Sequence, residues 1–454
     1  MEFGEAILGV GVGERPASFE AFSAAIDPEW IAEALAATGT ASLRRRKLPA
    51  EYVVWLVIGM ALFRDHGIPE VVRHLDLVLP TARGARGRVT PSALVQARTR
   101  LGPEPLAALF TQTAQVWAGA AANATRWRGL ALYGVDGTTL RVPDTAANDA
   151  AFGRPSTNRP QGGAAGYPQL RVVVLLVLRQ HLIAAAALGP FTRSEPALAT
   201  ALWAEVPEHA LVILDRGYTA YALFHTVGDV ARDRHWLVRV RTGRGALRWT
   251  VVARLGRGDD LVDWTPTHPR ASVGRGLPAT LRARAVRVHR RGFRPYVLLT
   301  SLLDPVAYPA AELAALYHER WEVEVAFDEV KTHTLARAET LRSQAPARVE
   351  QEVWGLLLGY NLVRFCMARA APRAGVPPLR LSYWHAVLLL RGFWQSAWYS
   401  SPGNLPRHVD TLVEEVALLV IPPRRTRRYP RAVKIKHSAY PRKWPTPHHG
   451  PGLN

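Results

Sequence analysis

The chain is poor in cysteine and contains no long uncharged apolar run. A single cysteine, Cys366, in 454 residues excludes an internal disulfide and is typical of proteins from a reducing compartment. No apolar stretch reaches the roughly 18 uncharged residues that a membrane span requires. The first residues also lack the basic start and the cleavage site of a signal peptide. The sequence therefore predicts a cytoplasmic protein with no membrane contact.

Acidic residues are scarce relative to basic ones. The chain has 57 Lys and Arg against 37 Asp and Glu, which gives a net charge of +20 and a pI near 10.7. Such an excess favours a polyanionic partner such as nucleic acid, although an arginine-rich composition also follows from genomic base bias. The hydrophobic share of 48% is that of a globular protein, and the length is enough for about two to four domains.

The predicted elements change in kind along the chain. Residues 1–125 read as helices with clear N-terminal caps, and residues 126–242 follow the order strand, strand, strand, helix, strand, helix, strand. That order is typical of a ribonuclease-H-like core. Residues 243–305 contain short alternating strands, residues 306–421 contain apolar helices, and residues 422–454 form a basic extended tail. The predicted fold is α/β: a ribonuclease-H-like catalytic core with a β-rich insertion, preceded by an all-α N-terminal domain.

A pair of helices near the N-terminus resembles a helix-turn-helix. The helices begin at Pro69 and Pro91, and an arginine-containing loop separates them. The second helix would present polar side chains to DNA bases or phosphates: Ser92, Gln96, Arg98 and Arg100. The alternative is a helical bundle with a basic surface.

Two aspartates follow apolar runs that are predicted to be strands. Asp136 lies where the run LALYGV gives way to Gly and Thr, and Asp215 ends the run ALVIL. In the predicted ribonuclease-H-like core we expect the two aspartates on adjacent strands. Both lie at positions where functional side chains are commonly displayed. Since Asp before Gly is also a common turn residue, a purely local role is the alternative for Asp136. Asp144 is the nearest competitor, and we interpret it as a loop cap.

The segment from residue 310 to 333 is predicted to be a helix with one functional face. At 100° per residue, its polar side chains Tyr317, Arg320, Glu324 and Lys331 fall within roughly 60° of each other, and Glu322 points to the other side. Asp328 falls on the same stripe, so helical geometry does not choose between it and Glu324. One acid among cations suits a metal ion beside a phosphodiester; the alternative is a solvated face of paired charges.

Lysine is the rare cation of this chain. Only five lysines occur among the 57 basic residues, and Lys331 is one of them. Since a basic position here would be arginine by default, lysine at 331 indicates a requirement for a compact ammonium group.

The spacing Y-(2)-R-(3)-E-(6)-K of these four residues resembles the signature of the DDE transposases of insertion-sequence family four. The segment GVDGTTLRVPDT resembles the first catalytic motif of that family, and LDRGYTAYALF resembles the second. The resemblance implies that Asp136, Asp215 and Glu324 are catalytic and bind Mg²⁺ or Mn²⁺. It also implies that Tyr317, Arg320 and Lys331 position the DNA backbone. No Cys/His spacing predicts a zinc site.

The resemblance implies cut-and-paste transposition, with metal-dependent nicking at the element ends and strand transfer by the freed 3′-hydroxyl. The expected partners are double-stranded DNA, the terminal inverted repeats of the chain's own element, and a second copy of the chain in a homodimer. The alternative enzyme is a ribonuclease-H-like nuclease or resolvase without strand transfer. A DNA-binding protein that has lost catalysis is disfavoured because all three motif acids are present, and the basic charge disfavours a two-carboxylate glycosidase.

Two further segments are candidates for DNA contact. The insertion contains aromatic residues that could stack on an unpaired base, Trp249, Trp264 and Tyr296. Residues 422–444 carry nine Arg or Lys and no acid, so the tail is expected to lie along DNA phosphates, with a solubilising terminus as the alternative.

Overall fold

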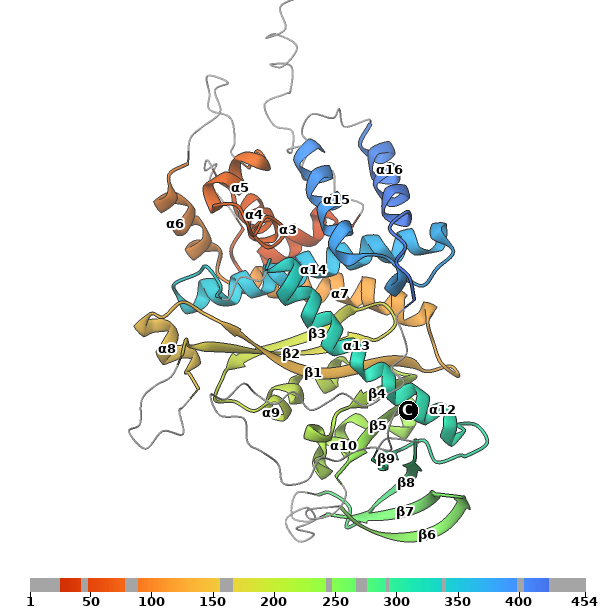
Figure 1. The fold of residues 1–454 in the computed structure, drawn as a ribbon. Helices are drawn as coiled ribbons and strands as arrows, with labels where there is room; N and C mark the ends of the chain where they lie inside the picture. Colours follow the sequence, from red (N-terminus) through yellow and green to blue (C-terminus); the bar gives the residue numbers. More distant parts are fainter. Residues whose placement is uncertain are drawn as a thin grey trace, which may run out of the picture.

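A mixed sheet with helices on both faces forms the centre of the molecule (Figure 1). The structure is a computed structural model, and it describes residues 25–41, 48–77, 89–155, 166–241, 247–266, 276–290, 294–336, 340–397 and 404–423. Residues 78–88, which include most of the predicted arginine-containing loop, and residues 424–454 of the predicted tail lie outside this range. The mixed α/β architecture with an N-terminal helical region is as predicted.

The N-terminal region is helical because its helices begin at local capping signals. The carboxylate of Asp27 accepts the N–H of Glu29, and the hydroxyl of Thr90 accepts the N–H of Ala93, as the sequence predicts. The apolar second helix is buried along its length and packs on a long C-terminal helix. The helices are α3 (Pro28–Ala37), α4 (Ala50–Leu62), α5 (Ile68–His74), α6 (Pro91–Leu101) and α7 (Glu104–Ala124).

Five strands form the half of the sheet that carries the two predicted aspartates. Their order is β3-β2-β1-β4-β5, in which β1, β4 and β5 are parallel and the other pairs antiparallel. The strands are β1 (Ala131–Arg141), β2 (Gln169–Val177), β3 (Leu182–Pro190), β4 (Ala210–Leu214) and β5 (Arg234–Val240). The connections contain α8 (Ala146–Phe152), α9 (Glu195–Ala199), η1 (Thr200–Glu205), η2 (Arg216–Tyr218), α10 (Tyr221–Val227) and η3 (Val230–Arg232).

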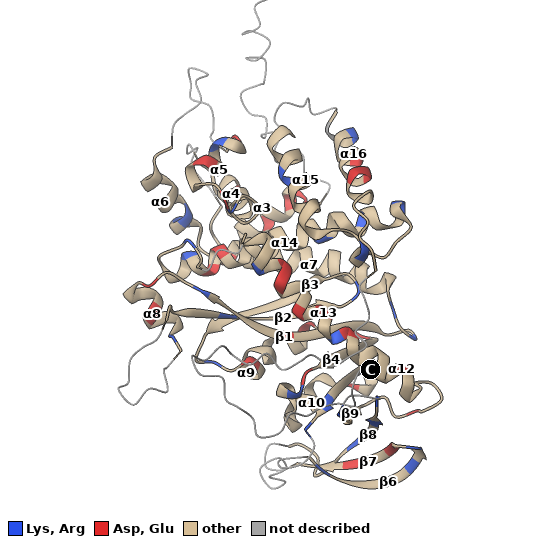
Figure 2. Cartoon of the chain, in the orientation of Figure 1, with Lys and Arg blue, Asp and Glu red and all other residues tan. Residues whose placement is uncertain are grey.

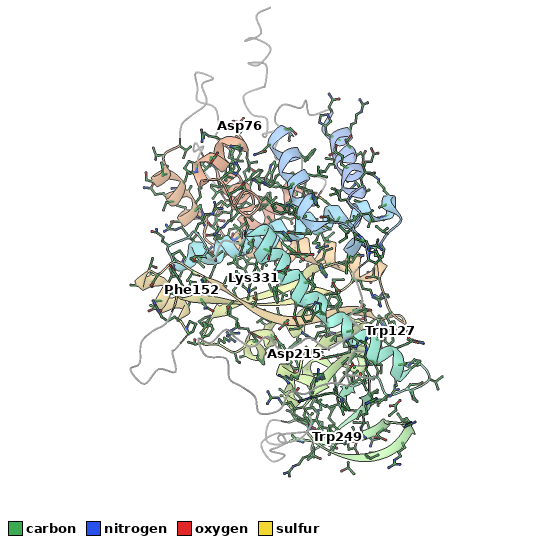
Figure 3. The ribbon with its side chains drawn as sticks, in the orientation of Figure 1. Asp76, Trp127, Phe152, Asp215, Trp249 and Lys331 are labelled. Carbon is green, nitrogen blue, oxygen red and sulfur yellow. The ribbon has the colours of Figure 1, made fainter. Side chains whose placement is uncertain are left out.

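The β-rich segment extends this sheet. Its last strand pairs antiparallel with β5, so the sheet continues without a break to nine strands. The added strands are β6 (Arg248–Gly256), β7 (Asp259–Thr265), β8 (Leu281–Val288) and β9 (Tyr296–Thr300). Trp264 is buried against Tyr221 and Phe224, so the expectation that it stacks on a DNA base is wrong: its ring belongs to the core. Trp249 lies on β6, at the far end of the sheet (Figure 3).

A helical run crosses the front of the sheet (Figure 1). The sequence predicts one regular α-helix here, but the structure has a 3₁₀ turn and a π-helical turn within the run. The segments are α12 (Ala310–Tyr317), η4 (His318–Arg320), α13 (Trp321–Asp328) and the π turn η5 (Glu329–Thr334). Because a π turn has hydrogen bonds from i to i+5, it changes the direction of the side chains that follow it.

The C-terminal helices cover the same side of the molecule as the N-terminal helices (Figure 1). They are α14 (Pro346–Ala374), η6 (Pro378–Arg380), α15 (Tyr383–Ser396) and α16 (Leu405–Ala417). The first of these contacts α4, α7, α15 and α16, and it therefore joins the two ends of the described chain. Within the described ranges, no helix is both long enough and apolar enough to cross a bilayer. The single cysteine, Cys366, is buried and reduced in α14.

Candidate active site

Asp136 lies inside a strand. The sequence predicts that the strand ends near this residue, but β1 continues to Arg141. The prediction failed because the polar residues after Asp136 pair with β2: Thr138 lies opposite Val172, and Thr139 opposite Arg171. The carboxylate of Asp136 accepts the N–H of Gly137 at 2.8 Å.

Asp215 follows directly on the neighbouring parallel strand. Val135 of β1 pairs with Leu214 of β4, so the next residues in each strand, Asp136 and Asp215, lie side by side. The Asp215 carboxylate also caps η2 by accepting the N–H of Gly217. Two acids separated by 79 positions in the sequence therefore meet at one point of the sheet.

Gly134 allows the helical run to pack closely on β1. A Cβ at this position would lie 2.6 Å from Cγ2 of Val323, closer than real Cβ atoms approach other heavy atoms. Since alternate residues of a strand point to the same face, Asp136 faces the same helical run as Gly134. The missing side chain at Gly134 thus sets how close α13 comes to the acids.

Arg320 joins an aspartate of the sheet to a glutamate of the helical run. Its guanidinium lies 3.5 Å from Oδ2 of Asp136 and 2.6 Å from Oε1 of Glu324. The other acid of the predicted stripe, Asp328, accepts a hydrogen bond from Thr332, and Glu322 pairs with His181. Among the acids of α13, Glu324 is the one that shares a cation with Asp136.

The site has more negative charge than its cations neutralise. The pKa of Asp136 is raised to about 6, mainly because the carboxyl group is buried and to a lesser degree because of the negative charges of Asp215 and Glu195. The N–H of Gly137 and the guanidinium of Arg320 lower this pKa but do not compensate. A carboxyl group in this position favours an added cation.

Two residues of the site were not predicted from the sequence. Glu195 on α9 lies against Gly137, where a Cβ would be 2.5 Å from its Cγ, and it pairs with Arg171. The hydroxyl of Tyr218 is buried without a hydrogen-bond partner, and burial together with the nearby acids raises the pKa of Tyr218. The position of Tyr218 two residues after Arg216 in the second motif was a usable signal, but nothing local links Glu195 to Asp136.

Comparison with known proteins gives matches along most of the chain. The family described as "Transposase DDE domain" matches residues 129–362, and "Insertion element 4 transposase N-terminal" matches residues 16–111. The transposase InsG for insertion sequence element IS4, of Escherichia coli (strain K12), is 38% identical over 418 residues, which cover 92% of each chain. The chain belongs to the IS4 family of DDE transposases.

More distant similarities accompany this match. The putative transposase InsZ of Escherichia coli (strain K12) is 32% identical to this transposase over 275 residues, covering 58% of the present chain and 89% of InsZ. A cryo-EM structure of the piggyBac transposase synaptic complex with hairpin DNA aligns with a TM-score of 0.42 at 12% identity, over 88% of this chain and 85% of that one.

In the part of the chain that the structure describes, the other two residues of the signature, Tyr317 and Lys331, do not form the kind of ion pair that joins Arg320 to Glu324. Tyr317 is half-buried, its ring centroid is 6.2 Å from that of Tyr296, and burial raises its pKa to about 12. Lys331 is exposed on the π turn and forms no ion pair with another described residue. Figure 3 shows Lys331 on the helical run and Asp215 at the end of its strand. The π turn means that the stripe calculated at 100° per residue does not extend to Lys331.

The N-terminal candidates for DNA contact separate into exposed and buried side chains. Gln96 and Arg100 are exposed on α6. Arg98 is only 4% exposed, and its guanidinium donates to Oε1 of Gln351 at 2.8 Å and to Oγ of Ser343 at 3.0 Å. The prediction that Arg98 contacts DNA is therefore wrong in this structure, because α6 turns this side chain toward α14.

The three acids could hold a hard divalent cation, since carboxylate oxygens are the ligands that Mg²⁺ and Mn²⁺ prefer. They do not form a closed ligand set. Among the described residues, the one group of His, Cys, Asp or Glu whose ligand atoms all lie within 4.8 Å of one another is elsewhere. The carboxylate of Glu324 is instead paired with Arg320.

Proposed function

We propose that this transposase catalyses cut-and-paste DNA transposition, with metal-dependent nicking at the ends of its element followed by strand transfer by the freed 3′-hydroxyl. The observation that carries the proposal is the position of Asp136 beside Asp215, under a helix whose Glu324 shares a guanidinium with Asp136. Membership of the DDE family supports the same three acids as the catalytic set.

Asp136, Asp215 and Glu324 are the residues that would hold Mg²⁺ or Mn²⁺. The all-oxygen donor set and the raised pKa of Asp136 both fit a divalent cation. Bound there, such cations activate an attacking oxygen and stabilise a leaving oxygen. For Glu324 to become the third ligand, its carboxylate must leave Arg320.

Release of Glu324 would free Arg320 for the DNA backbone. A guanidinium beside the acids can then donate two hydrogen bonds to one phosphate, a geometry that a lysine does not offer. Tyr317 borders the same site, and Lys331 would contact the backbone further along the helical run. Figure 2 shows basic residues on many elements around the sheet, in keeping with the net charge of +20.

Recognition of the terminal inverted repeats is proposed for the N-terminal helices. Gln96 and Arg100 on α6 are exposed and have the side chains that contact bases and phosphates. Cutting both ends of an element requires that two active sites act on paired ends, so we propose a homodimer in the DNA complex.

The test is cleavage of DNA that carries the terminal repeats of the chain's own locus, in Mg²⁺. The wild type and Asp136→Asn are compared with Asp144→Asn, a matched control whose carboxylate pairs with Arg154 on the surface. We expect cleavage by the wild type and the control and none by Asp136→Asn. Equal cleavage by all three proteins would remove Asp136 from the active site.

The same assay separates transposition from simple nuclease activity. A labelled donor end is incubated with target DNA, and covalent joining of donor to target is measured beside cleavage. Joining that depends on the terminal repeats supports the transposase mechanism. Cleavage of DNA without repeats, and no joined product, would support the ribonuclease-H-like nuclease or resolvase instead.

A further inference from the structure

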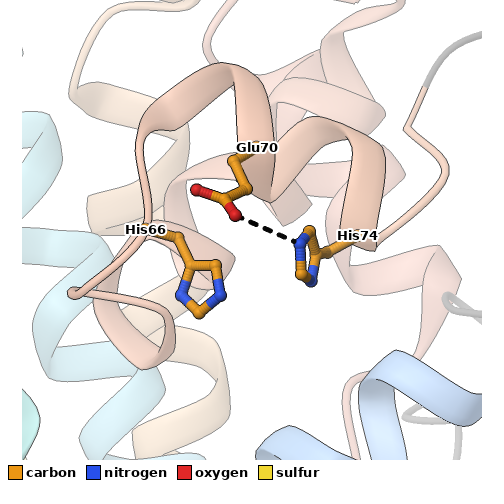
Figure 4. Close-up of side chains that lie close together, drawn as sticks. All are labelled: His66, Glu70 and His74. Atoms are coloured by element: carbon orange, nitrogen blue, oxygen red, sulfur yellow. Dashed lines mark ion pairs between the residues drawn. The ribbon is translucent and has the colours of Figure 1, made fainter.

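Three potential metal ligands meet at the N-terminal helices, far along the chain from the acids of the sheet. They are His66, in the turn after α4, and Glu70 and His74, one turn apart on α5 (Figure 4). Their ligand atoms all lie within 4.8 Å of one another. Nε2 of His74 is 3.6 Å from Oε1 of Glu70, and the ring centroids of the two histidines are 4.8 Å apart.

Neighbouring side chains orient both imidazole rings. Nδ1 of His66 lies 3.0 Å from Oδ1 of Asp65, and Arg391 of α15 holds that carboxylate with contacts of 2.7 and 2.8 Å. Nδ1 of His74 lies 2.8 Å from the amide nitrogen Nε2 of Gln395, also of α15. With both Nδ1 atoms engaged in this way, Nε2 of each ring remains for a ligand. A metal-binding histidine usually donates the N–H of its other ring nitrogen to a carboxylate or another oxygen acceptor, and this hydrogen bond fixes the orientation of the ring.

We propose that His66, Glu70 and His74 form a binding site for Zn²⁺ or a similar transition-metal ion. Two imidazoles and one carboxylate are a ligand set that Zn²⁺ favours, whereas Mg²⁺ prefers oxygen ligands alone. For His74 to coordinate through Nε2, its Nδ1 carries the proton, and the Gln395 amide is flipped so that its oxygen faces Nδ1 and accepts the hydrogen bond. The side chains of His66, Glu70 and His74 are 20%, 40% and 32% exposed, so a fourth ligand can come from solvent.

The bound ion would fasten the N-terminal helices to a C-terminal helix. Both histidine rings pack on Phe63, at centroid distances of 5.9 and 6.5 Å, and Phe63 packs on Trp394 of α15 at 6.0 Å. The ion would fix α5 against the end of α4. Two residues of α15 would be fixed with it: Gln395, the partner of His74, and Arg391, which holds the Asp65 carboxylate beside His66. Its role is therefore structural and differs from that of the cations proposed for the sheet acids.

The sequence predicts no zinc site, because it lacks the short Cys/His spacings of common zinc motifs. The spacing here is His-(3)-Glu-(3)-His. It places only the second and third ligands on one helix, and His66 reaches them because the chain turns between α4 and α5. The site thus depends on a turn that the spacing alone does not predict.

The test is Zn²⁺ binding to the full-length, tag-free chain after treatment with a chelator. Calorimetry is expected to give about one tight equivalent of Zn²⁺ that excess Mg²⁺ does not displace. Co²⁺ is expected to give the visible absorption of a low-symmetry, four- or five-coordinate site. The double variant His66→Gln/His74→Gln should weaken Zn²⁺ binding at least about 100-fold, and Asp65→Asn about 10- to 100-fold.

Two controls separate this site from others. His209→Gln removes an exposed histidine that also pairs with a carboxylate, Asp233, and Asp136→Asn alters the sheet acids. Both should bind Zn²⁺ as the wild type does. Equal affinity of the wild type and the double variant, or no tight equivalent in the wild type, would overturn the proposal. If circular dichroism shows that the double variant does not fold, Glu70→Gln gives the same decision. The readout does not involve DNA, so it is independent of the proposed transposition.

Discussion

Two glutamates of one helical run, Glu324 and Glu329, belong to carboxylate clusters whose negative charge is balanced differently. Glu324 and Asp136 share the guanidinium of Arg320 and are partly exposed, with burial raising the pKa of Asp136 to about 6. Glu329, five positions later, is buried, and it pairs with Arg364 and His181 and accepts a hydrogen bond from Tyr360 at 3.0 Å. Although burial opposes it, Arg364 and His181 lower the pKa of Glu329 to about 2.

This difference separates Glu329, an acid that fixes the structure, from Asp136, an acid that is proposed to bind a metal ion. Around Glu329, the positive charge of Arg364 and the hydroxyl of Tyr360 satisfy the carboxylate, and these contacts hold the π turn against α14. Asp136 and the three acids near it, Asp215, Glu195 and Glu324, outnumber the two arginines that pair with this group, Arg320 and Arg171, so negative charge is in excess. A divalent ion would bind most favourably at such a position, where carboxylates outnumber cations and are partly exposed.

The largest difference between the cluster of Asp136 and the buried cluster of Glu329 is expected in catalysis. Asp136→Asn should reduce cleavage of terminal-repeat DNA at least about 1000-fold, because it removes a charge that is proposed to hold the metal ion. The melting temperature without metal should not fall, since the amide removes repulsion from Asp215 and still accepts the N–H of Gly137. Cleavage assays and thermal denaturation measure the two effects. Loss of stability equal to the loss of activity would make Asp136 a structural acid like Glu329.

The reverse pattern is expected at the buried cluster. Glu329→Gln should lower the free energy of unfolding by about 3–5 kcal/mol, because Arg364 would be left buried without its charge partner. Denaturant titration measures this value. Glu319→Gln is the matched control: its pair with Arg179 is about one-third exposed and should cost at most about 1 kcal/mol. Similar costs at both positions would contradict the assignment of Glu329 as a structural acid.

The two acids should also respond to pH in opposite directions. Since the pKa of Asp136 is raised from 3.8 to about 6, its contribution to stability is present below pH 3.8 and is lost as pH rises through 6, by up to about 3 kcal/mol. The contribution of Glu329 is present above pH 4.5 and is lost as pH falls towards 2. Denaturation in chelator should therefore show wild type losing stability relative to Asp136→Asn between pH 4 and 6. Parallel curves would refute the raised pKa of Asp136.

The smallest structural effect is expected at the cation of the open cluster. Arg320→Gln should change the free energy of unfolding by no more than about 1 kcal/mol, because its partners are partly exposed. If Arg320 contacts a phosphate, the slope of log affinity against log salt should fall by about 1, and DNA binding should weaken at all sequences. Salt-dependent binding measurements test this. An unchanged slope would exclude Arg320 from the DNA backbone.

The parts of the fold that could be predicted from the sequence are those set by local interactions. Asp27 and Thr90 start their helices with hydrogen bonds to residues two and three positions away, and such caps can be read from the sequence. The continuation of β1 beyond Asp136 could not be predicted, because it depends on pairing with β2, whose partner residues lie 28 to 36 positions later. The joining of β9 to β5 is likewise a non-local pairing.

The candidate site divides in the same way. The three acids were identified through motifs, and the pairing of Glu324 with Arg320 follows from their spacing of four residues on a helix. The burial of Arg98 depends on Gln351 and Ser343, which lie about 250 positions later, so no helical period could exclude it. A helical period of 3.6 residues per turn could not predict the π turn, because Glu329 is held there by His181, between β2 and β3, and by Arg364 of α14.

The close contact at Gly134 has a consequence for the survival of the element in a genome. A single methyl group at this position would collide with Val323 and lift the helix that carries Glu324, although every acid would be intact. Copies that retain all three acids can therefore be inert, and counting acids alone overestimates how many copies still move. An inventory of mobile copies should also record whether glycine is kept where β1 meets this helix.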